Sequence, residues 1–277
     1  PEGLLDHVAE LPLALRTADV QRHGRHLVRA GLVLDEDVPD LRRRLGIPRR
    51  DFVVGLVSRI APEKNVEFLA HCVAQFLAAE PRARFVVAGT GPALPWMQQF
   101  FEERELAGRT HMPGSLEGDA LISAYRCMDV FAFASHSETQ GIVLAEAMAC
   151  GVPVVAVDAP GVREILVHGE NGLLLPADDA QQFTDALSHI AHLPGGQRRR
   201  MQRAARRCAH LFSIHESVDQ ALAIYRELIS RCSGMQSDRD SSVWEDAIQR
   251  IRTEWDLVVN MTKATGAALR KTLVKTG

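Results

Sequence analysis

The chain has 277 residues, and its 32 basic and 35 acidic side chains give it a formal net charge of −3. A hydrophobic fraction of 46% and a charged fraction of 24% are typical of a globular protein and exclude a wholly disordered or collagen-like chain. The near-neutral charge argues against a general nucleic-acid binder, and no apolar run approaches the roughly 18 residues of a membrane-spanning helix.

Short apolar runs alternate with amphipathic segments from residue 51 onward. The runs predict strands at 52–57, 84–88, 110–112, 130–134, 154–157 and 172–175. Helices are predicted at 41–45, 66–77, 93–106, 121–128, 142–149, 179–192, 197–211 and 215–230. This alternation implies parallel strands joined by right-handed crossovers, and hence an α/β domain with a Rossmann-like sheet of about six strands. Ligands of such a sheet bind beyond the carboxyl ends of its strands, so we expect the functional residues on the loops that follow strands.

Both ends of the chain fall outside this alternation. Residues 1–25 predict a helix with irregular chain, and residues 26–50 predict a connector. The small, polar stretch 233–242 predicts a linker. Beyond it, five apolar side chains share one predicted helix face: Trp244, Ile248, Ile251, Trp255 and Val258. This tail is expected to dock on the domain or on a neighbouring domain, with peripheral association with a membrane surface as the alternative.

The cysteines are scattered along the chain, and no two of them form a Cys-x-x-Cys pair. They are Cys72, Cys127, Cys150, Cys208 and Cys232. This pattern is typical of reduced thiols in a cytoplasmic protein and not of a disulfide framework or a zinc site, so we expect no metal. Residue 1 is Pro and not Met, which suggests a fragment or a processed chain.

The first candidate site lies where the first predicted strand meets the next helix. Arg59 follows the carboxyl end of the strand, and Lys64 is predicted to lie at the start of the next helix. Two cations beside the amide donors of a helix N-terminus suit a diphosphate, because the guanidinium fork, the ammonium group and the helix dipole all favour negative charge. For this segment alone, two surface cations are the alternative.

The second candidate site follows the fourth predicted strand. If the next helix begins near Gly141, Glu138 lies in the loop over the pocket and Glu146 lies more than one turn inside the helix. A carboxylate can accept hydrogen bonds from two vicinal hydroxyls, which is how sugars and riboses are held, and a glycine lets the backbone approach a ligand closely. Helix capping and a solvated helix face are the alternatives for the two glutamates.

A third candidate is the turn Gly89-Thr90-Gly91 after the second predicted strand. It resembles a dinucleotide fingerprint but fails the full Gly-x-Gly-x-x-Gly pattern, because position 94 is Leu. Pro92 also removes an amide donor. A nicotinamide oxidoreductase is therefore poorly supported, and a tight turn that could still face a ligand is the better interpretation.

Together these segments match one family pattern. The chain carries, in this order, VSRIAPEKN, VVAGTGP, HMPGSL, CMDVFAFASHSETQGIVLAEAMACGVPVVA, APGVREIL and NGLLLPADD. From about Gly31 to Ile229 it resembles the nucleotide-sugar-binding half of the retaining group 1 glycosyltransferases, which have two Rossmann-like domains (the GT-B type). The family commonly has Glu-x-Phe-Gly where this chain has Glu138-Thr139-Gln140-Gly141.

The resemblance implies a retaining hexosyltransferase that moves a sugar from a nucleoside-diphosphate sugar to a glycan or lipid acceptor, without a metal or another cofactor. Arg59 and Lys64 would neutralise the donor diphosphate, and Glu138 would face the donor sugar. These three would be the catalytic residues. Glu146 would hold the ribose hydroxyls. The other donor contacts would come from Met112 along the nucleobase and from Thr139, Gln140, Gly141 and Ile142.

The resemblance also implies a division of the chain into parts. Residues 1–30 would be a remnant of the N-terminal domain and the connector, 31–231 the donor-binding domain, 232–242 a linker and 243–277 a helical tail. Because the N-terminal acceptor domain would be missing, we expect little or no transfer by this chain alone. The expected location is cytoplasmic, with peripheral association at the inner membrane face as an alternative. A non-catalytic nucleotide-sugar-binding or assembly module is the competing hypothesis.

Overall fold

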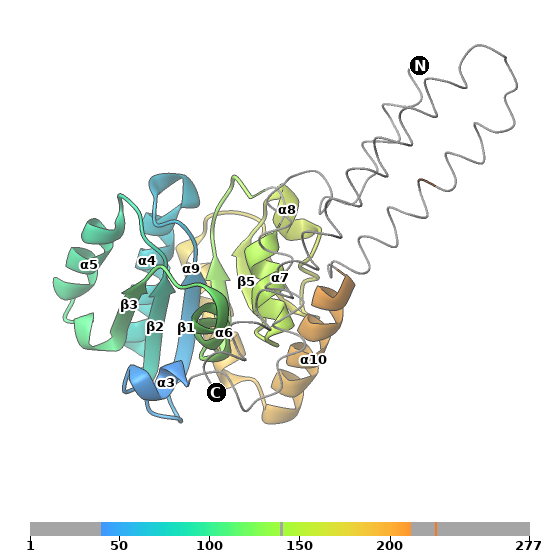
Figure 1. Ribbon diagram of the computed structural model, residues 1–277, viewed down its shortest axis with the longest axis horizontal. Coiled ribbons are helices and arrows are strands. Elements are labelled where there is room, and N and C mark those ends of the chain that lie inside the picture. The colour runs from blue at the N-terminus through green and yellow to red at the C-terminus, as the bar shows by residue number, and fades with distance from the viewer. Residues whose placement is uncertain (1–39, 139–140, 212–224, 226–277) are drawn as a thin grey trace, which may run out of the picture. The chain divides into compact units, whose positions relative to one another are not determined.

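A parallel sheet of six strands forms the centre of the part of the chain that the computed structural model describes, residues 40–138, 141–211 and 225 (Figure 1). The strands are β1 (Phe52–Val57), β2 (Ala83–Ala88), β3 (Thr110–Gly114), β4 (Val130–Phe133), β5 (Val154–Val157) and β6 (Gly172–Leu175). The chain divides into two units, Pro1–Leu222 and Ala223–Gly277, and the description below concerns the first.

Helices lie on both faces of the sheet (Figure 1). They are α3 (Leu41–Arg44), α4 (Val66–Ala79), α5 (Leu94–Glu102), α6 (Gly118–Arg126), α7 (Ile142–Ala149), α8 (Pro160–Arg163), α9 (Ala180–His192) and α10 (Gly195–Leu211). Short 3₁₀ turns occur at Pro62–Lys64 and Ala107–Arg109. The α/β architecture predicted from the sequence is therefore confirmed.

The strand order is β3-β2-β1-β4-β5-β6, and every neighbouring pair is parallel. Two apolar clusters hold the two layers of helices. One cluster packs α4, α5 and α9 on the first face, around Val54 and Phe183. The other packs α6, α7 and α10 on the second face, around Val53 and Phe131. Because successive strand residues point to opposite faces, the almost unbroken apolar run of β1 fills both layers.

The helix after β1 covers one face of the sheet, and the helix after β4 covers the other. The strand order therefore reverses between β1 and β4, which are direct neighbours. In a doubly wound sheet this reversal opens a crevice at the carboxyl ends of the two strands, and ligands bind there. The sheet topology thus selects two loops, the one after β1 and the one after β4.

Several element boundaries differ from the sequence-based expectation. The helix expected at 93–106 ends at Glu102, because Glu105 takes a left-handed conformation with φ of 58°. The third strand continues to Gly114, and α6 begins at Gly118 instead of 121. Helix α8 was not predicted, although Pro160 at its first turn is a common helix-start residue. Of the expected helix at 215–230, the structure describes only Tyr225, which is helical. The rest of that helix, the linker, the tail and residues 1–39 lie outside the described residues.

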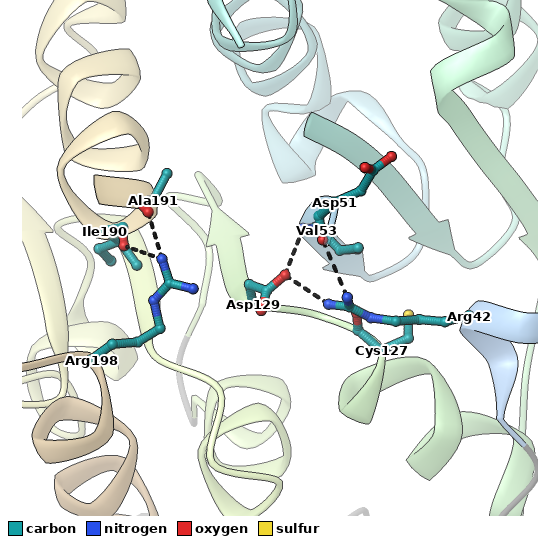
Figure 2. Close-up of polar contacts among 8 residues, drawn as sticks. All are labelled: Arg42, Asp51, Val53, Cys127, Asp129, Ile190, Ala191 and Arg198. Atoms are coloured by element: carbon teal, nitrogen blue, oxygen red, sulfur yellow. Dashed lines mark hydrogen bonds and ion pairs between the residues drawn. The ribbon is translucent and has the colours of Figure 1, made fainter. Parts of the chain in front are cut away.

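Helix α3 is attached to the amino end of the sheet, opposite the crevice (Figure 2). The guanidinium of Arg42 donates to Asp129 Oδ2 at 2.7 Å and to the carbonyl oxygen of Cys127 at 2.7 Å. The same Asp129 oxygen accepts the N–H of Val53 at 2.8 Å. Figure 2 also shows Arg198 capping the last carbonyls of α9, at Ile190 and Ala191. These arginines are therefore structural and do not belong to the crevice.

Candidate functional site

The loop after β1 carries the first pair of candidate residues, and the turn after β2 supports it. Ser58 and Ile60 donate backbone hydrogen bonds to Ala88 and Thr90. A Cβ atom at Gly89 would collide with the carbonyl oxygen of Ser58, and one at Gly91 with that of Ile60. Glycine is thus required at both positions because the two backbones touch, and the turn itself lies just after them, at Pro92 and Ala93.

Arg59 and Lys64 lie in different surroundings within this loop. The side chain of Arg59 is 66% exposed and forms an ion pair with Glu63, four residues later, at 2.8 Å. The side chain of Lys64 is 25% exposed, and its ammonium lies 3.7 Å from Glu138 Oε2. Lys64 lies just before the helix and not at its start, because it ends a 3₁₀ turn and α4 begins at Val66. The loop after β1 therefore presents one exposed cation and one half-buried cation.

Asn65 joins three loops at the carboxyl edge of the sheet. Its φ of 53° is left-handed, a conformation that asparagine tolerates better than most residues. Its side-chain amide donates to Asp178 Oδ2 at 2.9 Å and to the carbonyl oxygen of Ala134 at 3.3 Å. His136 contacts the same Asp178 oxygen at 2.9 Å. Sequence analysis gave Asn65 no role. The one signal in the sequence that could have pointed to it is its position between the charged segment Glu63-Lys64 and the start of the next helix.

Glu138 organises the loop after β4. Its Oε1 accepts the N–H of Gly141 at 2.9 Å, and its carbonyl oxygen accepts the N–H of Gly161 at 3.0 Å. Its side chain is 15% exposed and lies beside Lys64. This contact closes the loop before α7 and does not cap the helix, since Gly141 is itself the N-cap, and the solvated-face alternative is wrong. At the carboxyl edge of the sheet, the Glu138 carboxylate and the Lys64 ammonium face each other.

Gly141 and Ile142 begin the helix that follows this loop. Gly141 has φ of 64° and precedes α7 as its N-cap, as expected. A Cβ atom there would lie 2.5 Å from the carbonyl oxygen of Gly161, so the backbones of the loop before α7 and of α8 touch at this point. Ile142 is the half-buried first residue of α7. Thr139 and Gln140, the other two donor contacts expected in this loop, lie outside the described residues.

Glu146 lies in the second turn of α7, as its spacing from Gly141 predicted. Only 2% of the residue is exposed, so a solvated face is excluded. Its Oε2 accepts a hydrogen bond from the hydroxyl of Tyr125 at 2.7 Å. Burial, and after it the Glu146 carboxylate, raise the pKa of the Tyr125 phenol well above its ordinary value, so this hydroxyl stays protonated and donates. Tyr125 therefore contacts a candidate site residue, and sequence analysis gave it no role.

Met112 lies in β3, two strands away from β1 in the sheet. It is half-buried and packs against the apolar cluster of α4, α5 and α9. The end of its strand is tied to the turn after β2, since the carbonyl oxygen of Gly114 accepts the N–H of Gly89 at 2.8 Å. The carboxyl ends of β3, β2 and β1 therefore form one continuous edge beside the crevice.

Two further observations concern metals and membranes. Among the residues that the structure describes, no group of three or more His, Cys, Asp or Glu side chains could hold a metal ion. In that same part of the chain, no helix has the length and apolar character needed to cross a membrane.

Comparison with known proteins links this arrangement to one family. The family model of the glycosyl transferases group 1 matches residues 37–208. A D-inositol 3-phosphate glycosyltransferase from Mycobacterium tuberculosis is 33% identical over 254 residues, which cover 88% of this chain and 52% of that protein. The chain therefore spans about half the length of the curated relatives it matches.

Solved structures agree with the fold. Anabaena HepE in complex with UDP and glucose is 26% identical with a TM-score of 0.59, over 68% of this chain and 50% of that one. The C-terminal domain of a group 1 family protein from Francisella tularensis has a TM-score of 0.57 at 23% identity, over 65% of this chain and 95% of that one. At 23% identity, the match to the Francisella tularensis domain shows only that the fold is shared.

Proposed function

Because the chain belongs to the group 1 glycosyltransferases, we propose that it supplies the donor-binding half of an enzyme that transfers a sugar from a nucleoside-diphosphate sugar. The acceptor is a glycan or a lipid, and the transfer retains the anomeric configuration. The chain matches about half the length of each curated relative, which supports the proposal that it supplies one half of the enzyme. The UDP and glucose bound to the similar HepE structure support the class of donor.

One observation carries this proposal. Lys64 comes from the loop after β1 and Glu138 from the loop after β4, and the two residues are 74 positions apart in the sequence. Their charged groups nevertheless lie 3.7 Å apart, at the point where the strand order reverses. A nucleotide in this crevice would place its diphosphate near Lys64 and its sugar near Glu138. The ammonium would stabilise the charge that develops on the diphosphate as the bond to the sugar breaks.

Arg59 supplies the second cation of the proposal. Its long, exposed side chain now pairs with Glu63, also largely exposed, and such surface pairs contribute little free energy. A diphosphate carries more charge than one carboxylate and accepts the guanidinium fork at two oxygens, so Arg59 can exchange partners at small cost. Two further contacts complete the proposed site. Glu146, which is buried in α7, would accept hydrogen bonds from the ribose. The backbone of Met112 would lie along the base.

Calorimetric titration of the chain with UDP, GDP and ADP tests the donor site. We expect one of these nucleotides to bind and Lys64→Met to weaken it about tenfold or more, as for removal of a charged hydrogen-bond partner. Arg82→Met is the matched control, because it removes one positive charge from the exposed turn before β2, at the amino end of the sheet. Absence of binding to all three nucleotides by the folded chain refutes the proposal, as does an equal effect of the two substitutions.

The competing non-catalytic module would bind a nucleotide as well, so transfer must be measured in a protein that includes the acceptor domain. We expect Glu138→Gln to reduce transfer there more than it reduces nucleotide affinity. Retention is checked by the anomeric configuration of the product in NMR spectra. Unchanged transfer by Glu138→Gln would favour the non-catalytic module, and an inverted product would refute retention.

A further inference from the structure

We propose that Tyr125 is a positioning residue for ribose recognition: its hydroxyl fixes the Glu146 carboxylate so that this group can accept the two vicinal hydroxyls of a nucleotide. The inference rests on the proposed function, because it assumes that a ribose reaches Glu146. It extends that function to a residue on another helix, 21 positions earlier in the chain.

The two side chains meet inside the layer of helices on one face of the sheet. Tyr125 lies in the last turn of α6 and Glu146 in the second turn of α7, and each residue is 2% exposed. The Tyr125 ring packs against Phe131 of β4, with ring centroids 5.9 Å apart. A ring held in this way leaves its hydroxyl little freedom, so the 2.7 Å hydrogen bond to Glu146 has a defined direction.

Glu146 is the one charged residue of α7, whose sequence is IVLAEAMA. Burying a carboxylate in such a helix is costly unless hydrogen bonds compensate for the lost water. A carboxylate offers about four acceptor positions on its two oxygens. The Tyr125 hydroxyl uses one of them, on Oε2, and thereby restricts the rotation of the carboxylate plane. A vicinal diol donates two hydrogen bonds, and a carboxylate held in one orientation can accept both of them.

A purely structural role is the alternative, in which Glu146 serves only to satisfy a buried tyrosine hydroxyl. The two roles differ in what they predict for ligands. A structural pair affects every nucleotide equally, through the stability of the domain. A positioning pair affects nucleotides that carry the 2′- and 3′-hydroxyls and has no effect on nucleotides that lack them.

Tyr125→Phe tests this difference, since it removes the hydroxyl and keeps the ring. Affinity is measured by calorimetry for the nucleoside diphosphate that binds (UDP, GDP or ADP) and for its 2′,3′-dideoxy analogue. We expect about a tenfold loss for the ribose form, the scale of one hydrogen bond to a charged group, and no change for the dideoxy form. Equal losses for the two forms, or no loss for the ribose form, overturn the proposal.

Ser123→Ala is the matched control on the same helix. Ser123 is 4% exposed, and its hydroxyl accepts the backbone N–H of Leu41 at 3.1 Å. Its removal also deletes a buried hydroxyl from α6, and we expect it to lower thermal stability without changing the ratio of the two affinities. A changed ratio in this variant would mean that any loosening of α6 disturbs ribose binding, and the proposal would fall.

Glu146→Gln separates this inference from the proposed function. If this variant loses the preference for the ribose form and Tyr125→Phe keeps it, the ribose site stands and the positioning role is refuted. If Glu146→Gln also keeps the preference, or if no nucleotide binds the unmodified chain, the ribose role of Glu146 is refuted and the positioning role with it.

A second measurement needs no destabilising variant. The chain contains two tyrosines, Tyr125 and Tyr225, so replacement by 3-fluorotyrosine gives two fluorine signals, assigned with Tyr225→Phe. We expect the Tyr125 signal to move when the ribose nucleotide binds, because the Glu146 carboxylate gains new donors. We expect a much smaller movement with the dideoxy analogue. Equal movement with both ligands, or none with either, contradicts the proposal.

Discussion

Replacing Gly141 by alanine tests the contact that shapes the loop after β4. Gly141 has φ of 64°, and a Cβ atom there would lie 2.5 Å from the carbonyl oxygen of Gly161 and 3.2 Å from Cγ2 of Ile165. Gly46 is the matched control, because its φ is 66° and a Cβ atom there would meet nothing within 4 Å. The two substitutions share the backbone penalty and differ in the close approach.

The expected loss of stability follows from these two contributions. A left-handed conformation costs an L-residue roughly 1–2 kcal/mol, of which the stiffer unfolded chain returns about 0.4–1 kcal/mol. Gly46→Ala should therefore cost roughly 1 kcal/mol. Steric overlap in a packed region adds about 1–3 kcal/mol, so Gly141→Ala should cost about 2–4 kcal/mol.

Urea unfolding followed by circular dichroism measures both free energies, and an unchanged m-value would show that the unfolded state is comparable. Gly141→Ala should also weaken nucleotide binding, because Gly141 donates its N–H to Glu138, whereas Gly46→Ala should leave binding unchanged. Equal losses of stability in the two variants would refute the close approach of the Gly141 and Gly161 backbones.

Two further predictions concern the core and the amino end of the sheet. Burial raises the thiol pKa of Cys72, Cys127 and Cys150 from 9.0 to about 12, so the unfolded chain loses these protons first and stability should fall as the pH rises from about 9 towards 12. A melting temperature that stays constant from pH 8 to 11 would contradict this. Asp129→Asn should lower the free energy of unfolding in urea by about 1–3 kcal/mol, because it weakens charged hydrogen bonds to α3 and β1. Asp158→Asn is the control: it changes an exposed ion pair with Arg163 and should lower that free energy by less than about 1 kcal/mol. Similar costs for the two would show that the α3 attachment contributes little.

Most of the fold was predictable because its determinants are local in sequence. The apolar runs of the six strands and the three- and four-residue spacing of the helices were sufficient to predict a doubly wound α/β sheet. The boundaries that were missed depend on single backbone conformations. Glu105 ends α5 in a left-handed conformation, and Asn65 separates a 3₁₀ turn from α4. Residue-type preferences predict the Glu105 conformation poorly, and asparagine tolerates a left-handed conformation without requiring one.

The candidate site was predictable in composition but not in geometry. Arg59, Lys64, Glu138 and Glu146 were proposed because they lie in or shortly after the loops that follow strands, in an order that resembles a known family. Their surroundings differ from one another more than the pattern indicated. Arg59 is exposed and paired with its own loop, whereas Lys64 and Glu138 are largely covered and face each other. A one-dimensional pattern contains no information on the depth of a side chain below the surface.

The sequence by itself determined the strands, the helices between them and the chemical types of residue at the carboxyl edge of the sheet. Hydrophobic periodicity and turn residues act over a few positions, so they can be recognised without a structure. Only the tertiary structure decided which of these residues meet. The Lys64–Glu138 pair, the Asn65 bridge to Ala134 and Asp178, and the Tyr125 hydrogen bond to Glu146 join segments far apart in the chain. They form because the strand order and the crossovers bring those loops and helices to one place.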